Sequence, residues 1–157
     1  MTEINLGADW RLLEAPLDWG IERLSRVMAT QTGWMDCALP CDVHMPLERA
    51  GRIKNVVLAD YCFDAEWIER RSWWFAREFA GADIDLDAEV IELTLESLDA
   101  HADVFLNGEW LGAHVSAFYP FAQGVKGRVR PGKNELVVRM TTGLETVSDA
   151  DLSELNW

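Results

Sequence analysis

Tryptophan is frequent in this chain, with 8 tryptophans among its 157 residues. An exposed indole ring stacks well on the C–H face of a sugar, whereas a buried one supplies large apolar area to a core or a domain interface. Trp73 and Trp74 are neighbours, so in a strand they would point to opposite faces. One of the two could therefore lie in the core while the other packs on another domain or a ligand.

Carboxylates are abundant, with 27 acidic residues against 14 basic ones. Glycoside hydrolysis uses two carboxylates, but in so acidic a chain a pair at any spacing indicates little. Asn134-Glu135 has the order found at the acid/base position of many retaining glycosidases. Here it stands in Pro-Gly-Lys-Asn-Glu-Leu, which predicts a turn residue followed by a solvent-facing strand residue. We expect no catalytic residue in this chain.

Nucleophiles and metal ligands give no recognisable pattern. None of the 3 histidines has a serine or cysteine placed to suggest a triad, and no nucleotide-binding or metalloprotease motif occurs. Cys37, Cys41 and Cys62 do not make an even disulfide set, which favours free thiols in a reducing, cytoplasmic setting. Cys37, Cys41 and His44 could bind a metal, but their spacing matches no common zinc pattern. We expect no metal and no cofactor.

The bulk composition limits the partners. The formal net charge is −13, which disfavours nucleic acid and anionic membrane surfaces, since both are bound through basic patches. No apolar run reaches the length of a membrane span, and no signal peptide follows Met1. A composition of 49% hydrophobic and 26% charged residues is typical of one globular domain with a sizeable core.

The elements that must position these residues read as strands joined by turns. Asn107-Gly108 lies between two strand-like segments in the stretch Asp103–Gly112 and predicts a type I′ hairpin turn. Val90–Glu96 alternates apolar and polar residues, and Leu136–Met140 follows the turn signal Pro131-Gly132-Lys133. This pattern predicts an all-β sandwich.

The remaining segments predict a first strand within 4–13, a loop over 16–25 and one or two short strands within 27–39. Asp42 is placed to cap a short helix over 43–50 that Gly51 would end, and a helical turn is expected over 64–68. In the strand predicted over 73–80, Arg77 shares a face with Trp73, Phe75 and Phe79. Either Arg77 is paired in a partly buried site or a bulge changes the phase.

Four segments, in this order along the chain, resemble the N-terminal sugar-binding domain of family 2 glycoside hydrolases, nearest the β-mannosidase branch. Residues 39–53 resemble P-x-x-V-H-x-x-L-x-x-A-G-x-I, and residues 67–79 resemble W-x(5)-W-x-Y-x-x-x-F. Residues 98–112 resemble D-x-x-A-x-V-x-L-N-G-x-x-L-G, and residues 131–139 resemble P-G-x-N-x-L-x-V.

The resemblance implies a jelly-roll β-sandwich, galactose-binding-domain-like, with one or two short helices over residues 1–143. Residues 144–157 would be an acidic helix or linker, with Ser148 capping a helix over 146–155. In β-mannosidase-like relatives a W-D-W-G-P segment, a last sandwich strand and a catalytic barrel follow. We therefore expect a domain cut before its last strand, with self-association through an unpaired edge or local disorder over 143–157.

The function implied is that of a non-catalytic N-terminal domain of a glycoside hydrolase acting on β-linked sugars, of β-mannosidase or β-galactosidase type. Its partners would be carbohydrate, bound by the intact enzyme, and the downstream domains. A free-standing carbohydrate-binding module and a purely structural docking domain remain alternatives. Residues 55–62 depart from the family's D-P-Y-Y-G-x-N-E, so the contact of its Asn is not carried over to Tyr61. The candidate sugar contacts are Asp60, Tyr61, Trp67, Trp74 and Arg77.

Overall fold

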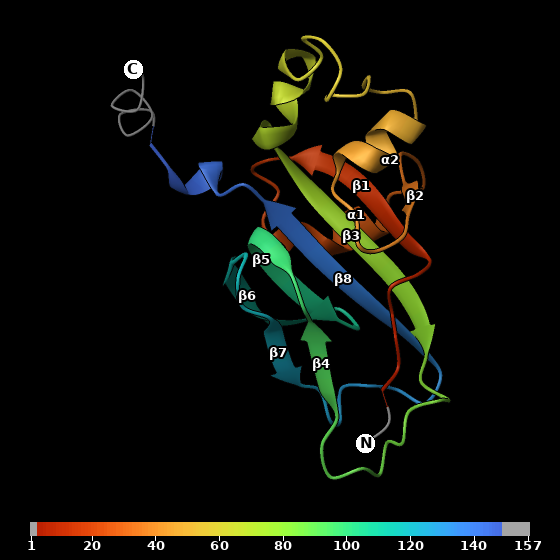
Figure 1. The fold of residues 1–157 in the computed structure, drawn as a ribbon. Helices are drawn as coiled ribbons and strands as arrows, with labels where there is room; N and C mark the ends of the chain where they lie inside the picture. Colours follow the sequence, from red (N-terminus) through yellow and green to blue (C-terminus); the bar gives the residue numbers. More distant parts are fainter. Residues whose placement is uncertain (1–2, 149–157) are drawn as a thin grey trace.

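The computed structural model describes residues 3–148, which form two antiparallel sheets with short helices around them (Figure 1). The larger sheet has the strand order β2-β1-β3-β8-β5-β6, and the smaller pairs β4 with β7. The strands are β1 (Trp10–Pro16), β2 (Met35–Cys37), β3 (Arg71–Ala80), β4 (Glu92–Leu95), β5 (Leu98–Leu106), β6 (Glu109–Ser116), β7 (Phe121–Gly124) and β8 (Lys133–Thr141). This architecture confirms the predicted β-sandwich.

Two α-helices and three 3-10 turns complete the described chain. They are η1 (Ile21–Arg23), α1 (Leu24–Ala29), α2 (His44–Arg49), η2 (Phe63–Arg70) and η3 (Leu144–Thr146). None of the helices within residues 3–148 is long and apolar enough to cross a membrane. The helix predicted over 146–155 falls mostly on residues 149–157, which lie outside the described part of the chain.

The large sheet is buried on both faces along its central strands. Trp73 and Phe75 of β3 belong to the main core, whereas Trp74 and Ala76 belong to a second cluster on the opposite face. The segment that carries η1 and α1 covers this second cluster. Adjacent β3 residues therefore point to opposite faces, as predicted, and both are buried because each face has its own cover.

The Asn107-Gly108 turn adopts the predicted conformation, with φ values of 54° and 84° at its two central residues. Leu106 pairs with Glu109 across the turn, and a register shift follows between Val104 and Phe105. The pairing of β5 with β6 is thus irregular close to the turn, just beyond the pair Phe105–Trp110.

A hydrogen-bonded pair of asparagines, Asn107 and Asn134, joins this hairpin to β8. Asn107 Nδ2 donates to Asn134 Oδ1 at 2.9 Å, and Glu135 N–H donates to Asn107 Oδ1 at 3.0 Å. Asn134 also donates to the carbonyls of Arg130 and Gly132, and it is fully buried. The prediction that Asn134 is a turn residue was wrong, because Asn134 lies in β8 and pairs with Phe79 of β3. Its buried amide links the start of β8 to the hairpin.

The short helix α2 begins as predicted. Asp42 Oδ1 accepts the backbone N–H of His44 at 2.8 Å and that of Met45 at 3.1 Å. Gly51 follows the helix with a φ of 67°, a conformation in which a residue with a Cβ is strained. The first strand lies later than predicted, over β1. Helix α1 occupies residues expected to be loop or strand, and β2 is the strand found within 27–39.

Candidate functional site

The predicted sugar contacts Asp60 and Tyr61 lie in the loop that precedes η2. Asp60 is exposed and its carbonyl accepts the N–H of Phe63 at 3.1 Å. The Lys54 ammonium lies 4.4 Å from the centre of the Tyr61 ring, a cation–π contact that covers one face of this ring. The same loop exposes the side chains of Val57 and Leu58. This surface loop therefore exposes both polar and apolar side chains. Its geometry alone does not indicate a ligand contact.

Trp67 is half-buried beside the main core. Its ring lies 6.1 Å from the ring of Trp73, and the Arg52 guanidinium lies 5.6 Å from its centre. Arg52 and Arg71 both form ion pairs with Glu14. These contacts hold Trp67 in a fixed orientation at the edge of the core, so its indole is anchored mainly by protein groups.

Trp74 corrects the sequence analysis, because its side chain has no exposed surface. Its Nε1 donates to Ser72 Oγ at 3.2 Å, and its ring is stacked on Phe105 with the centroids 6.1 Å apart. A ligand cannot stack on an indole that is covered on both faces by protein. Trp74 is a core residue of the second cluster rather than a sugar contact.

Arg77 resolves the choice between pairing and a bulge. Strand β3 pairs with β8 residue by residue through this region, without a register shift. The Arg77 side chain instead reaches the carbonyl of Ala8. Among the described residues, Arg77 Nε is the buried side-chain nitrogen left without a hydrogen-bond partner. Arg77 is thus paired and partly buried, and the five predicted contacts do not converge on one site.

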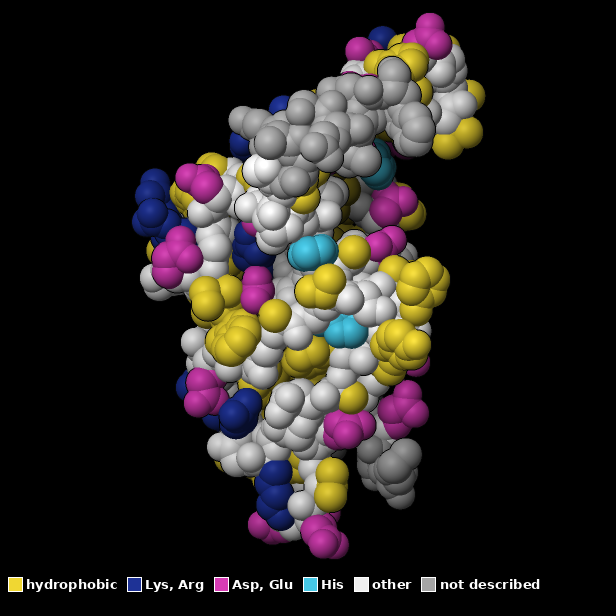
Figure 2. Space-filling model, turned by 90° about the vertical axis from the view of Figure 1, so that its left-hand side faces the viewer, with side chains coloured by type: hydrophobic (Ala, Val, Ile, Leu, Met, Phe, Trp, Pro, Cys, Tyr) yellow, Lys and Arg dark blue, Asp and Glu magenta, His cyan; other side chains and the backbone are white. Residues whose placement is uncertain are grey.

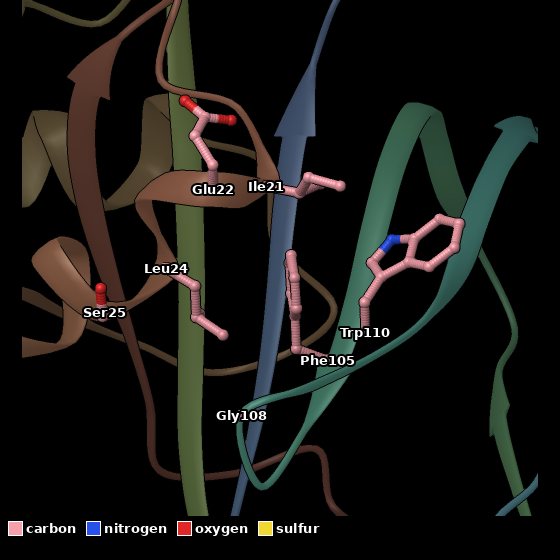
Figure 3. Close-up of a pocket in the computed structure, with 7 residues that line it drawn as sticks. All are labelled: Ile21, Glu22, Leu24, Ser25, Phe105, Gly108 and Trp110. Carbon is pink, nitrogen blue, oxygen red and sulfur yellow. The ribbon is translucent and has the colours of Figure 1, made fainter.

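A groove that the sequence analysis missed lies between the η1–α1 segment and the β5–β6 hairpin (Figure 3). It has a volume of about 430 Å³, and its walls are formed by Ile21, Glu22, Leu24, Ser25, Phe105, Gly108 and Trp110. Figure 3 shows Trp110 on one side, Ile21 and Leu24 on the other and Phe105 between them, with Glu22 pointing away from the rings. The groove is apolar at its centre and polar at one end.

The Trp110 ring is held in place while half of its surface stays exposed. Its exposed fraction is 49%, and its Nε1 donates to Asp103 Oδ1 at 3.2 Å. The other oxygen of Asp103 pairs with Arg139 at 3.2 Å. An indole that is both oriented and exposed is suited to stack on a flat apolar ligand face. The sequence signal was a tryptophan on an edge strand directly after a hairpin turn.

The side chain of Arg139 is buried behind the Trp110 ring, where it contacts Asp103. Only 8% of its side chain is exposed, and it donates to the carbonyl of Trp19 at 2.7 Å and to Glu145 Oε1 at 3.2 Å. Burial alone would raise the pKa of Glu145. Hydrogen bonds from the Thr141 hydroxyl, its own backbone and Arg139 outweigh burial and hold that pKa below its ordinary value. The Glu145 carboxylate is therefore a structural anion.

The described residues show no ready metal centre or catalytic carboxylate pair. No group of three His, Cys, Asp or Glu side chains within residues 3–148 is arranged to hold a metal ion. The most buried carboxylates with ion-pair partners, Glu14 and Asp103, are each bound to arginine. Figure 2 shows the apolar side chains over β5–β7 in several separate groups.

The sheet order and the asparagine-linked hairpin define a β-sandwich domain of the galactose-binding-domain-like class. The family described as "Glycosyl hydrolase 2 galactose-binding domain-like" matches residues 19–153. That range is most of the chain, and the chain therefore belongs to this family of N-terminal domains of glycoside hydrolases.

Individual relatives agree with this assignment. A Caenorhabditis elegans protein named "Probable beta-mannosidase" is 25% identical over 107 residues, which are 68% of this chain and 12% of that protein. The solved β-D-mannosidase of Dictyoglomus thermophilum superposes with a TM-score of 0.80 at 20% identity, over 99% of this chain and 17% of the other. A β-glucuronidase of Bifidobacterium dentium superposes with a TM-score of 0.63 at 22% identity, over 86% of this chain and 19% of the other. The chain thus spans a small part of its relatives.

Proposed function

We propose that the chain serves as the non-catalytic N-terminal domain of a glycoside hydrolase that acts on β-linked sugars, with β-mannosides as the first candidate substrates and β-galactosides as the second. The observation that carries this proposal is the superposition on a β-D-mannosidase over 99% of the chain. The matched β-glucuronidase covers less of the chain and superposes less closely. The carbohydrate and the downstream domains would be partners of the intact protein.

A physical argument supports the non-catalytic role. Retaining hydrolysis needs an acid and a nucleophile whose carboxyl groups lie about 5 Å apart across the scissile bond. In the described residues, the carboxylates of Glu14, Asp103 and Glu145 are each held by arginine in an ion pair. Carboxylates engaged in this way are not free to protonate a leaving group or to attack a sugar. We therefore place the catalytic pair in the downstream part of the parent protein.

Hydrolysis of aryl β-glycosides tests this proposal. The 157-residue chain should release no aryl alcohol from aryl β-mannoside or β-galactoside above the buffer blank. The full-length parent protein should cleave the mannoside fastest. Turnover by the short chain would contradict the non-catalytic role. A full-length protein that cleaves neither substrate would contradict the parent activity.

A free-standing carbohydrate-binding module is the second candidate, and the Trp110 groove is the observation that favours it. The half-exposed indole offers a stacking face, and Glu22 and Ser25 offer hydrogen-bonding groups at the rim. Isothermal titration with mannose, galactose and their oligomers should give heat that Trp110→Ala abolishes. Phe118→Ala is the matched control, because Phe118 is 91% exposed and does not line the groove. Titrations without heat would exclude this candidate.

A purely structural docking domain is less favoured. Its exposed apolar side chains should form one continuous patch. Instead Val57 and Leu58 lie in the loop before η2, whereas Val115 lies on β6 and Phe118 after it. The loop before η2 and strand β6 lie apart in the molecule (Figure 1). We further infer a cytoplasmic location, for which the free cysteines are the support. Fractionation of the native cells would test that inference.

A further inference from the structure

The two walls of the Trp110 groove come from parts of the chain that are far apart in sequence. Trp110 belongs to the β5–β6 hairpin, whereas Ile21 belongs to η1, in the segment between β1 and β2. Strand β8, which pairs with β5, passes behind the groove between these walls (Figure 3). A side chain of β8 that points to this face of the sheet is therefore placed to contact both walls.

Arg139 of β8 is that side chain. On the hairpin side, its Nη1 donates to Asp103 Oδ2 at 3.2 Å, and Asp103 Oδ1 accepts the indole N–H of Trp110 at 3.2 Å. On the opposite side, its Nε donates to the carbonyl of Trp19 at 2.7 Å, and its Nη2 donates to the carbonyl of Leu17 at 3.3 Å. One planar group thus binds both sides of the groove.

The backbone after Trp19 carries this hold into η1. Gly20 follows directly, and its carbonyl accepts the N–H of Arg23 at 3.0 Å, which closes η1 around Ile21. None of the three residues of η1 is buried, so packing contributes little to holding this wall in place. The position of Ile21 therefore depends on the backbone that Arg139 binds.

We propose that Arg139 is a positioning residue of the Trp110 groove, whose guanidinium sets both the orientation of the Trp110 ring and its separation from η1. This inference rests on the proposed sugar-binding function of the groove. A guanidinium directs its donors along fixed, coplanar directions and can hold acceptors on two sides at once, whereas a lysine ammonium keeps the charge but lacks this fork. Walls that are held before a sugar arrives lose less conformational freedom on binding.

Nuclear magnetic resonance of the whole chain with isotope-labelled tryptophan tests this clamp without any ligand. In Arg139→Lys, the indole N–H signal of Trp110, assigned with Trp110→Phe, should shift, and its hydrogen exchange should accelerate. The indole signals of Trp10 and Trp73 should stay in place, because both rings are buried in the main core on the other face of the sheet. An unchanged Trp110 signal would overturn the proposal.

Asp103→Ala separates a clamp on two walls from a general loosening. It removes the acceptor of the Trp110 indole but leaves the bonds from Arg139 to the carbonyls before η1. Both variants should therefore move the Trp110 signal, whereas hydrogen exchange of the Arg23 amide, which closes η1, should rise only in Arg139→Lys. Equal effects of the two variants on the Arg23 amide would overturn the proposal.

The unaltered chain provides a measurement that does not depend on the folding of a variant. The Nε–H of Arg139 should exchange slowly, because it is buried and donates to a carbonyl. The Nε–H of Arg130, whose side chain is exposed, is the control and should exchange fast. Equal rates for the two arginines would show that the guanidinium does not hold the groove.

Isothermal titration with mannotriose distinguishes the clamp from the binding function on which it rests. The affinity of Arg139→Lys should be about tenfold weaker than that of the unaltered chain, because its groove must be ordered on binding. Asp42→Ala, which alters the cap of α2 rather than the groove, is the control and should keep the affinity. Equal affinities of Arg139→Lys and the unaltered chain would contradict the positioning role. Absence of heat from the unaltered chain would refute sugar binding, whereas the resonance signals decide on the clamp by themselves.

Discussion

Arg139 links several polar groups behind the Trp110 ring. It pairs with Asp103 and Glu145, whose side chains are 16% and 25% exposed, and its own is 8% exposed. Removing it leaves two partly buried carboxylates without a cation. We expect Arg139→Met to lower the free energy of unfolding by about 3 kcal/mol, the low end for a broken buried pair because its partners keep some water. Urea unfolding measures this loss.

The ion pair between Lys133 and Glu78 supplies the control. Its nitrogen–oxygen distance is 2.6 Å, but the side chains are 69% and 46% exposed. Lys133→Met should therefore cost less than about 1 kcal/mol in the same assay. Equal losses for the two variants would show that burial of Arg139 does not set the stability.

Glu145 should make stability depend on pH. Its pKa in the folded state lies below the ordinary value of 4.5. A carboxylate with a lowered folded pKa contributes stability above its unfolded pKa and loses that contribution as the pH falls through the folded pKa. The unaltered chain should thus exceed Glu145→Gln in free energy of unfolding at pH 7, and the difference should shrink below pH 4.5.

Urea unfolding of both proteins at several pH values measures the Glu145 contribution. Glu89→Gln, at an exposed position, is the control and should track the unaltered chain throughout. A difference between the unaltered chain and Glu145→Gln that stays constant with pH would contradict the assignment.

The conformation of a single residue was predictable where it depends on the residue type and its neighbours in sequence. The positive φ values at Asn107-Gly108 follow from the residue types themselves. The opposite faces of Trp73 and Trp74 follow from the strand geometry, but which of them would reach solvent does not. Trp74 is buried because a segment far away in the chain covers it. The sugar contact predicted for Trp74 failed for that reason.

At the scale of elements, α2 depends on its cap. It has 6 residues, too few to be stable alone. Asp42→Ala removes the acceptor for two backbone N–H groups and should cost about 1 kcal/mol. Hydrogen exchange of the amides in α2 should rise more than exchange in β3. Asp42→Asn retains the acceptor and should behave like the unaltered chain, so equal effects of both substitutions would contradict capping.

Elements with local signals were predicted, and elements stabilised from a distance were not. The hairpin, β8 and α2 each have a turn or cap in their own sequence. Helix α1 has Leu24, Val27 and Met28 on one face, yet it is only 6 residues long and is held by packing on the outer face of the sheet. The Trp110 groove was missed for a related reason. Its walls come from Ile21 and from the hairpin, which only the strand order brings together.

At the scale of the whole molecule, the sandwich is unequal. Its described part has 6 strands in one sheet and 2 in the other, and β6 pairs on one side only. A free strand edge is a template for pairing with another chain. The formal charge of −13 opposes such contact, since like-charged molecules repel. The balance between the free edge and the net charge therefore decides whether the chain associates.

We expect self-association that is weak at low salt and stronger at high salt. The screening length falls from about 10 Å at 0.1 M to about 3 Å at 1 M, so salt removes the repulsion but leaves strand pairing intact. Sedimentation velocity over a range of concentrations should show a rising sedimentation coefficient at 1 M salt. Val115→Lys should suppress this rise, because Val115 is 66% exposed on β6 and lysine on an edge strand hinders pairing. Val90→Lys is the matched control, since Val90 is 73% exposed outside the strands. A monomer at every concentration and salt would refute pairing through this edge, and equal effects of the two lysines would assign the change to charge alone.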